Sequence, residues 1–304
     1  MNDDRRCIMK IIRIKQRNIY LTICLLMICV ISTGLSIVPR AVDYKTQEVA
    51  ADTESVDLPI IMYHSILKDS SKAGDYVVSP DTLEADIKFL SDNGYTFILS
   101  QDLIDYVYNG GFLPERPVII TFDDGYYNNY FYAWEILKKY NAKAIISPIC
   151  AECVNYTENP NENPNYGYCS VKNLTEMYES GIWEIANHSF DMHEYGSRQG
   201  SKIKQYEDVG SYKDLFEEDA LKAQGYLEDE IGCKILAYTY PFGAFCKQSE
   251  EFLQELGYKV TYITQDKNNT ITRSPECLYK LSRYNRPSGI STAQFMQKIK
   301  PKTP

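Results

Sequence analysis

The sequence centres on residues 117–125, which read Pro117-Val118-Ile119-Ile120-Thr121-Phe122-Asp123-Asp124-Gly125. The apolar run after the proline is typical of a short buried strand. Two adjacent carboxylates end this strand, and Gly125 allows the chain to turn after them. Because successive side chains of a strand point to opposite faces, Asp123 and Asp124 are expected to have different roles, one toward a metal ion and the other toward a substrate. A surface turn without chemical function is the alternative.

Strand and helix patterns alternate on both sides of this stretch. Strands are expected at 58–63, 95–99, 118–122, 142–149, 182–186, 235–238 and 258–263, and helices at 80–93, 103–107, 129–140, 173–180, 213–231, 248–256 and 292–299. Two long polar loops are expected at 154–170 and 195–212. Strict alternation predicts a parallel sheet in an α/β fold. About seven such units fit a (β/α) barrel with fewer than eight regular strands.

The composition is that of a globular protein with an acidic body. Hydrophobic residues make up 44% of the 304 positions, and the formal net charge is −9. Residues 1–18 carry +4, so the remainder of the chain carries −13. An acidic body argues against nucleic acid as a partner.

The N-terminal region predicts a membrane segment. Residues 19–38 are uncharged and mostly apolar, and a run of 20 residues is long enough to cross a bilayer. The basic residues of 1–18 precede this run, which predicts a cytoplasmic tail, an anchor in the cell membrane and an extracellular body. A cleaved signal peptide, with secretion of the body, is the competing interpretation. Residues 39–56 are polar and predict a linker, which places the folded body at 57–304.

Six of the nine cysteines fall in the expected folded body: Cys150, Cys153, Cys169, Cys233, Cys246 and Cys277. An even number in an exported domain permits up to three disulfides, whose pairing remains open. The spacing of Cys150 and Cys153 is compatible with a redox or zinc site, but no second pair of this kind accompanies it. A disulfide across the polar loop 154–170 is therefore expected.

The chain contains only three histidines, His64, His188 and His193. The last two are five residues apart, which on a helix would separate them by about 140°. They can share a metal ion only if a strand end bends into a loop. With Asp124 they would form a His/His/carboxylate site with open positions, which suits a catalytic divalent ion, most simply zinc. Two unrelated surface histidines are the alternative.

Three motifs resemble those of the polysaccharide deacetylases, the NodB-homology domain of carbohydrate esterase family four. The first is Thr121-Phe122-Asp123-Asp124-Gly125, the second is the segment from His188 to His193, and the third is Tyr240-Pro241-Phe242-Gly243. The five-residue histidine spacing resembles the branch that deacetylates poly-N-acetylglucosamine. The resemblance covers residues 57–298, and it implies a distorted (β/α)₇ barrel.

The resemblance also implies roles for the first two motifs. Asp123 would be the general base that activates the attacking water, and Asp124, His188 and His193 would hold the metal ion. The common family pattern takes its general acid from a late Leu-x-x-His motif, but no histidine follows His193. The poly-N-acetylglucosamine branch resembles the segment around His64 instead. We therefore expect His64 to protonate the leaving amine, and a histidine of purely structural function in the core is the alternative.

The third motif implies contacts with the substrate. The backbone N–H of Phe242, which follows Pro241, would help to bind the oxyanion of the tetrahedral intermediate. Four tyrosines near the motifs are candidates for stacking on sugar rings, with a position in the core or at its rim as the alternative: Tyr63, Tyr126, Tyr127 and Tyr240. The family often carries an arginine two residues before the proline, where it orients the base aspartate, and Thr239 occupies that position here. Arg283 is a candidate to supply the charge from another strand, and an ordinary surface arginine is the alternative.

These expectations combine into one function. The chain would be a membrane-anchored, metal-dependent hydrolase that removes N-acetyl groups from a cell-surface polysaccharide containing N-acetylglucosamine. Peptidoglycan and poly-N-acetylglucosamine are the main candidate substrates. A catalytically inactive glycan-binding domain and an esterase for O-acetylated, xylan-type glycans are the alternatives. The polymer and the oligomeric state remain open.

Overall fold

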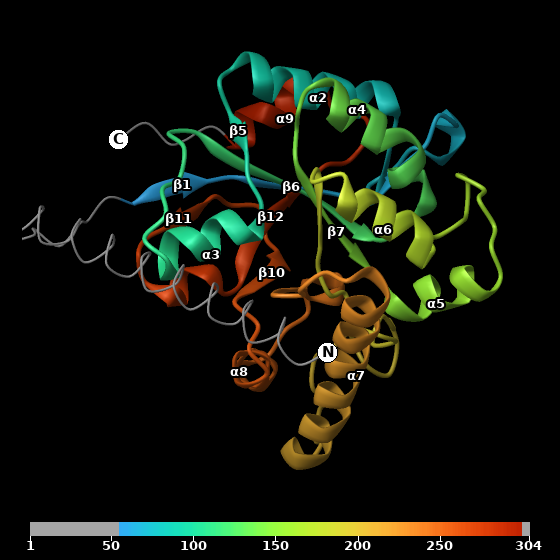
Figure 1. Ribbon diagram of the computed structural model, residues 1–304, viewed down its shortest axis with the longest axis vertical. Coiled ribbons are helices and arrows are strands. Elements are labelled where there is room, and N and C mark those ends of the chain that lie inside the picture. Colours follow the sequence, from blue (N-terminus) through green and yellow to red (C-terminus); the bar gives the residue numbers. More distant parts are fainter. Residues whose placement is uncertain (1–54, 300–304) are drawn as a thin grey trace, which may run out of the picture. The chain divides into compact units, whose positions relative to one another are not determined.

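The computed structural model describes residues 55–299, which form an α/β fold around a parallel sheet, as expected (Figure 1). The predicted basic tail, the predicted membrane segment at 19–38 and nearly all of the predicted linker lie outside the described residues. Between residues 55 and 299, no helix has the length and apolar character needed to cross a membrane.

The central sheet is strongly curled. Its order is β8 (Trp183–Ile185), β7 (Ala144–Pro148), β6 (Pro117–Asp124), β2 (Ile60–Tyr63), β12 (Leu281–Asn285), β10 (Val260–Thr264) and β9 (Ala237–Thr239), and β5 (Thr96–Phe97) also pairs with β6. All of these pairings are parallel. The two ends of the sheet meet at Asn187, whose N–H donates to Ala237 O and whose carbonyl accepts the N–H of Thr239. Asn187, which follows β8 in the chain, thus connects the two ends of the sheet and closes the ring of strands.

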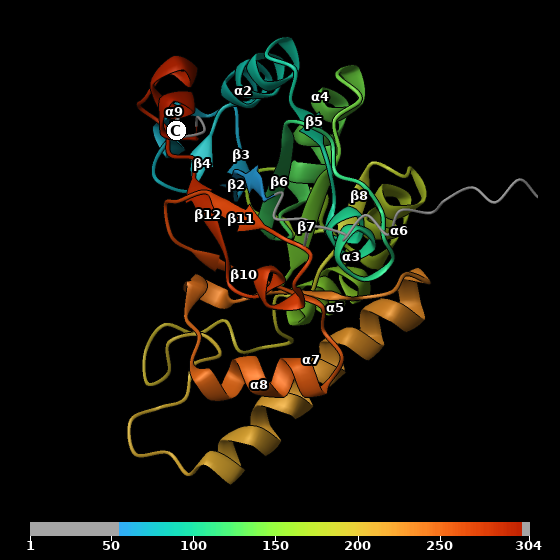
Figure 2. The ribbon, with the colours of Figure 1, turned by 90° about the vertical axis from the view of Figure 1, so that its left-hand side faces the viewer.

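Helices surround the sheet. They are α2 (Pro80–Asp92), α3 (Ser100–Tyr108), α4 (Trp134–Lys139), α5 (Cys150–Glu158), α6 (Val171–Glu179), α7 (Val209–Ile231), α8 (Lys247–Glu255) and α9 (Thr292–Ile299). In both views, α2, α4 and α9 lie on one side of the sheet, and α7 and α8 lie on the other (Figures 1 and 2). Two small strand pairs lie outside the main sheet: β1 (Val56–Leu58) with β11 (Asn269–Ile271), and β3 (Ser65–Ile66) with β4 (Val77–Val78).

The alternation of side chains along β6 divides the core into two clusters. Ile120 and Phe122 belong to the larger cluster, which includes buried side chains of α2, α4, α6 and α7. Ile119 belongs to the smaller cluster, with side chains of α3 and β10. Because the period of a strand is two residues, Thr121 and Asp123 share the face of Ile119. The first carboxylate of the Asp-Asp pair is therefore on the inner face of the curled sheet.

Three expectations need correction. The segment 154–170 is not a loop throughout, because α5 continues to Glu158. The loop expected at 195–212 is also shorter, because α7 begins at Val209. The Asp208 side chain caps this helix by accepting the Ser211 N–H. The expected disulfide across 154–170 is absent, and all six cysteines of the described region are free thiols. Cys150, Cys153 and Cys169 are buried in the larger core cluster, where they pack as small apolar side chains.

Candidate active site

A cavity of about 380 Å³ lies where several parallel strands of the sheet end. Strands β2, β6, β8 and β9 each carry a predicted site residue at or just after their carboxyl ends, and parallel strands bring those ends to one edge of a sheet. The cavity is lined by Met62, His64, Tyr76, Asp123, Asp124, Tyr126, His188, His193, Tyr195, Gln199, Phe242 and Thr264. Residues as far apart in the sequence as Met62 and Thr264 thus line one cavity.

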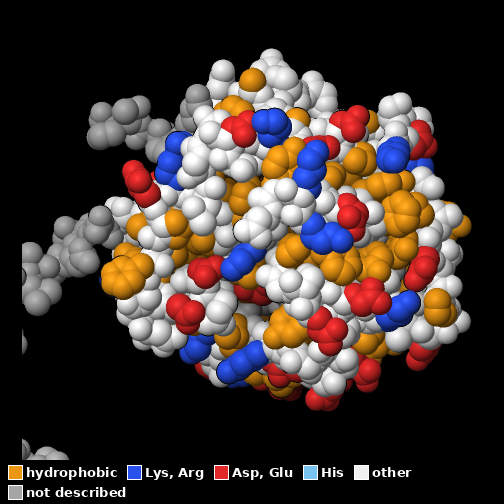
Figure 3. Space-filling model, turned by 45° about the horizontal axis from the view of Figure 1, so that its top comes forward, with side chains coloured by type: hydrophobic (Ala, Val, Ile, Leu, Met, Phe, Trp, Pro, Cys, Tyr) orange, Lys and Arg blue, Asp and Glu red, His pale blue; other side chains and the backbone are white. Residues whose placement is uncertain are grey.

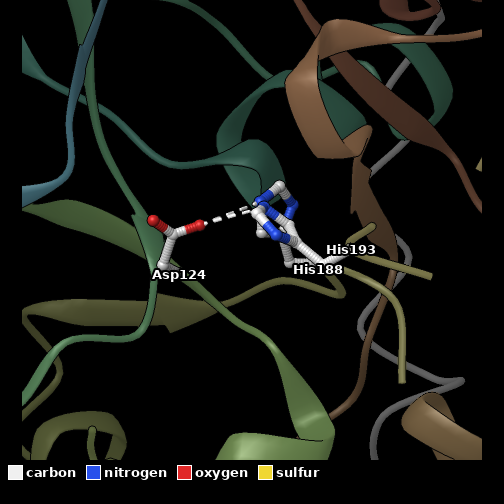
Figure 4. A group of neighbouring side chains, drawn as sticks. All are labelled: Asp124, His188 and His193. Carbon is white, nitrogen blue, oxygen red and sulfur yellow. Dashed lines mark ion pairs between the residues drawn. The ribbon is translucent and has the colours of Figure 1, made fainter. Parts of the chain in front are cut away.

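Asp124, His188 and His193 come together in the arrangement that suits a metal ion (Figure 4). Asp124 Oδ1 lies 3.5 Å from His188 Nε2 and 3.2 Å from His193 Nε2, and the three candidate ligand atoms lie within 4.8 Å of one another. The Nδ1 atom of His188 lies 2.7 Å from the carbonyl oxygen of Thr239. A carbonyl only accepts, so Nδ1 carries a proton, which leaves Nε2 as the ring atom available to a metal ion.

The bend after His188 explains how two histidines five residues apart converge. Ser189 has φ 69°, a left-handed conformation that is costly for a residue other than glycine. Its N–H donates to Asn187 Oδ1 at 2.8 Å, which holds the bend locally. The next two N–H groups, of Phe190 and Asp191, both donate to the carboxylate of Asp219 on α7, at 2.9 and 2.8 Å. The packed helix therefore fixes the course of the loop between the two histidines.

A second bend follows Asp124 at the end of β6. Asp124 itself has φ 68°, and Gly125 has φ 79°. A Cβ atom at Gly125 would lie 2.7 Å from the Cβ of Pro148, closer than real Cβ contacts allow. Only glycine fits at this point, so Gly125 is required by the turn that directs Asp124 toward the histidines.

Asp123, the other carboxylate of the Asp-Asp pair, is paired with Arg283 of β12. Arg283 Nη1 donates to Asp123 Oδ1 at 2.6 Å, and Nη2 donates to Oδ2 at 2.8 Å. Both side chains are buried. Burial by itself would raise the pKa of Asp123, but the Arg283 guanidinium and the nearby His188 outweigh burial and lower this pKa. Asp123 is therefore an oriented carboxylate that can accept a proton.

His64 lies on the other side of Asp123. Its Nε2 atom is 4.0 Å from Asp123 Oδ2, and its ring contacts the Tyr76 ring edge-on with centroids 4.7 Å apart. Its Nδ1 atom is buried and has no hydrogen-bond partner among the described residues. Burial lowers the pKa of His64, although the charges of Asp123 and Asp124 oppose this shift. His64 thus faces the same cavity as the base carboxylate.

The third motif contributes Phe242 to the cavity, but Tyr240 does not reach it. Phe242 has φ 58°, is 42% exposed and packs on the His193 ring with centroids 4.5 Å apart. The Tyr240 ring is fully buried, and its hydroxyl donates to Glu250 Oε2 at 3.3 Å. The expectation that Tyr240 stacks on a sugar is therefore wrong, because alternation at the end of β9 turns this ring into the core. Pro241 is buried as well.

Several lining residues were not singled out from the sequence as part of the site. Tyr76, Tyr195 and Gln199 lie in polar segments without periodicity, where no local pattern indicates which side chains face a cavity. The only available signal was an aromatic residue inside an otherwise polar stretch. On the face shown in Figure 3, basic and acidic side chains are interspersed with hydrophobic ones, without a continuous basic patch of the kind that binds nucleic acid.

Comparison with known proteins identifies a family model and relatives that are similar to this chain. Residues 111–261 match the sequence model of the polysaccharide deacetylase family. A poly-beta-1,6-N-acetyl-D-glucosamine N-deacetylase of Staphylococcus epidermidis is 28% identical over 209 residues, which cover 69% of this chain and 68% of that protein. The protein of the same name from Staphylococcus aureus is 30% identical over 202 residues. That match covers 65% of this chain and 64% of the relative, slightly less than two thirds of its length.

A solved structure of similar fold is a de-N-acetylase from Aggregatibacter actinomycetemcomitans. Its TM-score is 0.69 and its sequence identity is 24%, and the superposition covers 80% of this chain and 99% of that chain. The present chain therefore shares the fold of that de-N-acetylase.

Proposed function

We propose that this chain is a polysaccharide deacetylase, whose family model matches residues 111–261, and that it hydrolyses N-acetyl groups of a polymer of N-acetylglucosamine. The observation that carries this proposal is the convergence, in one cavity, of an Asp/His/His cluster with a carboxylate oriented by an arginine. Hydrolysis of an amide requires an activated water, a group that stabilises the developing oxyanion and an acid for the leaving amine. The cavity contains a candidate for each.

The residues present fit a divalent metal ion, for which we propose zinc. Two imidazole nitrogens and one carboxylate oxygen face one another, and the Thr239 carbonyl fixes the tautomer of His188 that a ligand requires. Asp124, His188 and His193 would hold the ion. A divalent ion bound there would supply Lewis-acid catalysis at the acetyl carbonyl.

Asp123 and His64 divide the proton transfers between them in this proposal. Asp123 takes a proton from the attacking water, and His64 gives a proton to the leaving nitrogen when the C–N bond breaks. Asp123 Oδ2 and His64 Nε2 lie 4.0 Å apart, so a subsequent return of the proton from Asp123 to His64 would pass through one intervening water. Arg283 keeps Asp123 ionised and oriented, and the backbone N–H of Phe242 is proposed to bind the oxyanion.

The names of the relatives support poly-β-1,6-N-acetylglucosamine as the substrate in preference to peptidoglycan. The test is acetate release by the full-length chain from a β-1,6-linked N-acetylglucosamine pentamer, after chelation and again with zinc restored. Metal-dependent release is the expected result, and His64→Ala is expected to retain zinc but lose turnover. Release only from O-acetylated xylan would identify an esterase instead. Binding of the pentamer without release from any substrate would identify a glycan-binding domain.

The sequence of residues 1–38 supports a further proposal about location. A 20-residue apolar run after a basic segment favours a membrane anchor with the catalytic domain outside the cell. Recovery of the full-length chain in the membrane fraction, with the domain accessible to added protease in intact cells, is the expected result. A shortened soluble product in the medium would favour a cleaved signal peptide.

A further inference from the structure

We propose that Tyr76 and Tyr195 are two sugar-binding platforms on opposite walls of the cavity, so that the enzyme binds the units on both sides of the one that it deacetylates. This inference rests on the proposed function, because it takes the substrate to be a polymer of N-acetylglucosamine. It predicts a preference for longer oligomers and assigns that preference to two residues outside the three sequence motifs.

The first observation is the exposure of these rings. Tyr76 is 59% exposed and Tyr195 is 76% exposed, yet both line the cavity that contains the candidate catalytic groups. The faces of a pyranose ring carry C–H groups that pack on aromatic rings, and tyrosine adds a hydroxyl that remains hydrated at the rim. An exposed tyrosine beside a reacting centre is therefore suited to a neighbouring sugar unit.

The second observation is that each ring contacts a residue of the reacting centre. The Tyr76 ring lies edge-on against His64, with centroids 4.7 Å apart. The Tyr195 ring lies edge-on against Phe242 at 5.5 Å, and Phe242 in turn packs on His193 at 4.5 Å. A sugar on either platform would thus be directly adjacent to the sugar at the centre.

The third observation is the sheet order, which places the two platforms far apart around the ring of strands. His64 follows β2, and Phe242 follows β9. Going around the ring, β12 and β10 separate β2 from β9 on one side, and β6, β7 and β8 separate them on the other. In a ring of seven strands this is the greatest possible separation, so a chain bound to both platforms must cross the cavity.

The fourth observation is that backbone contacts hold the segments that carry both rings before any ligand binds. The carbonyl of Tyr76 accepts the N–H of Ser65, the residue after His64. The turn that carries Tyr195 is closed by the Gly200 N–H, which donates to Glu194 O. A Cβ atom at Gly200 would lie 2.6 Å from Pro241 O, so this turn packs directly on the third motif. Platforms fixed in this way lose little conformational entropy when they bind.

The test compares the full-length chain with Tyr76→Ala, Tyr195→Ala and the double variant on β-1,6-linked N-acetylglucosamine oligomers of one to five units. We expect each single variant to lose about fivefold to tenfold in kcat/KM on the pentamer, the usual scale for one aromatic contact. The double variant is expected to lose roughly the product of the two factors, since the sites are separate. Activity on the single sugar, which fills only the central position, is expected to fall by a smaller factor than activity on the pentamer.

Two kinds of control separate stacking from other effects. Tyr76→Phe and Tyr195→Phe keep the ring and are expected to behave as the unsubstituted chain. Tyr206→Ala removes a tyrosine that is 95% exposed in the same polar segment as Tyr195 but does not line the cavity, and it is expected to have no effect.

Binding of the pentamer to the chelated chain, measured by calorimetry, tests the platforms without turnover. Weaker binding by both alanine variants supports the proposal, even if no acetate is released and the proposed function fails. Unchanged binding and kinetics in both variants would overturn it. An equal loss on the single sugar and the pentamer would also overturn it, because the rings would then act only by packing on His64 and Phe242.

Discussion

Replacement of Arg283 by methionine tests the link between the fold and the candidate chemistry. The substitution removes two charge-assisted hydrogen bonds, of 2.6 and 2.8 Å, from a carboxylate that is only 3% exposed. It leaves Asp123 as a buried charge without its partner. Breaking a buried ion pair in this way typically costs about 3–5 kcal/mol of unfolding free energy. Since domains are commonly stable by about 5–15 kcal/mol, the variant is expected to fold with a reduced margin.

The effect on catalysis should be separable from the effect on stability. Without the guanidinium, the pKa of Asp123 rises because burial is no longer opposed by Arg283, and the carboxylate loses its fixed orientation. Loss of an oriented general base typically costs about 10²-fold or more in turnover. We therefore expect Arg283→Met to reduce kcat by at least this amount under conditions where the protein remains folded.

Arg286 provides a matched control. It forms a comparable buried pair with Asp86, with Arg286 Nε 2.6 Å from Asp86 Oδ2, and neither residue lines the cavity. Arg286→Met is expected to lose a similar amount of stability, measured by urea unfolding with a chelator present, while turnover per folded molecule is retained. A double-mutant cycle with Asp123→Asn should give a coupling energy of about 2 kcal/mol for the Arg283 pair.

Three results would refute the reasoning. If Arg283→Met retains turnover within a factor of three, the arginine does not position the base. If the coupling energy between positions 123 and 283 is near zero, the ion pair contributes nothing beyond the two separate side chains. Loss of turnover in Arg286→Met to the same extent would show that reduced stability alone explains the effect.

Further predictions concern the metal site, the turn after β6 and the half-buried acid Glu184. Loss of a residue that only supports a metal ligand typically weakens metal binding by roughly 10–100-fold. His188→Ala removes a ligand itself and should weaken zinc binding by more than this. The zinc affinity of His64→Ala, measured by titration, should match that of the unsubstituted chain. Gly125→Ala should destabilise the protein by about 1–3 kcal/mol in urea unfolding, because the added Cβ would lie 2.7 Å from Pro148 at a φ of 79°. An unchanged midpoint of urea unfolding would contradict this close approach of residue 125 to Pro148. Burial raises the pKa of Glu184 to about 7, so the folded chain holds a proton that the unfolded chain loses near its ordinary value of 4.5. Stability should therefore fall between about pH 4.5 and 7 and then level off, and Glu184→Gln should flatten this dependence; equal slopes for both proteins would exclude Glu184 as the cause.

Much of the fold could be predicted because its signals are local. The alternation of strand and helix patterns indicated a parallel α/β fold, and Ser79 and Pro80 marked the start of α2 at the residue where the structure has it. The Asp-Asp-Gly turn was recognisable because a buried strand that ends in two carboxylates is unusual. The extents of α5 and α7 and the state of the cysteines were not predictable in this way, since packing against neighbouring elements decides them.

In the candidate site, too, some features could be predicted from the sequence and others depend on the tertiary structure. Residue type and order along the chain were enough to select Asp123, Asp124, His188 and His193 as candidates, because few groups can bind a metal or accept a proton. Only the tertiary structure brings Arg283 to Asp123, 160 residues away in sequence, since that contact depends on the order of strands in the curled sheet. Only the tertiary structure also decides that Tyr240 faces the core while Tyr76 and Tyr195 face the cavity. Periodicity states which residues share a face of one element, but the closure of the sheet determines which faces of different elements meet.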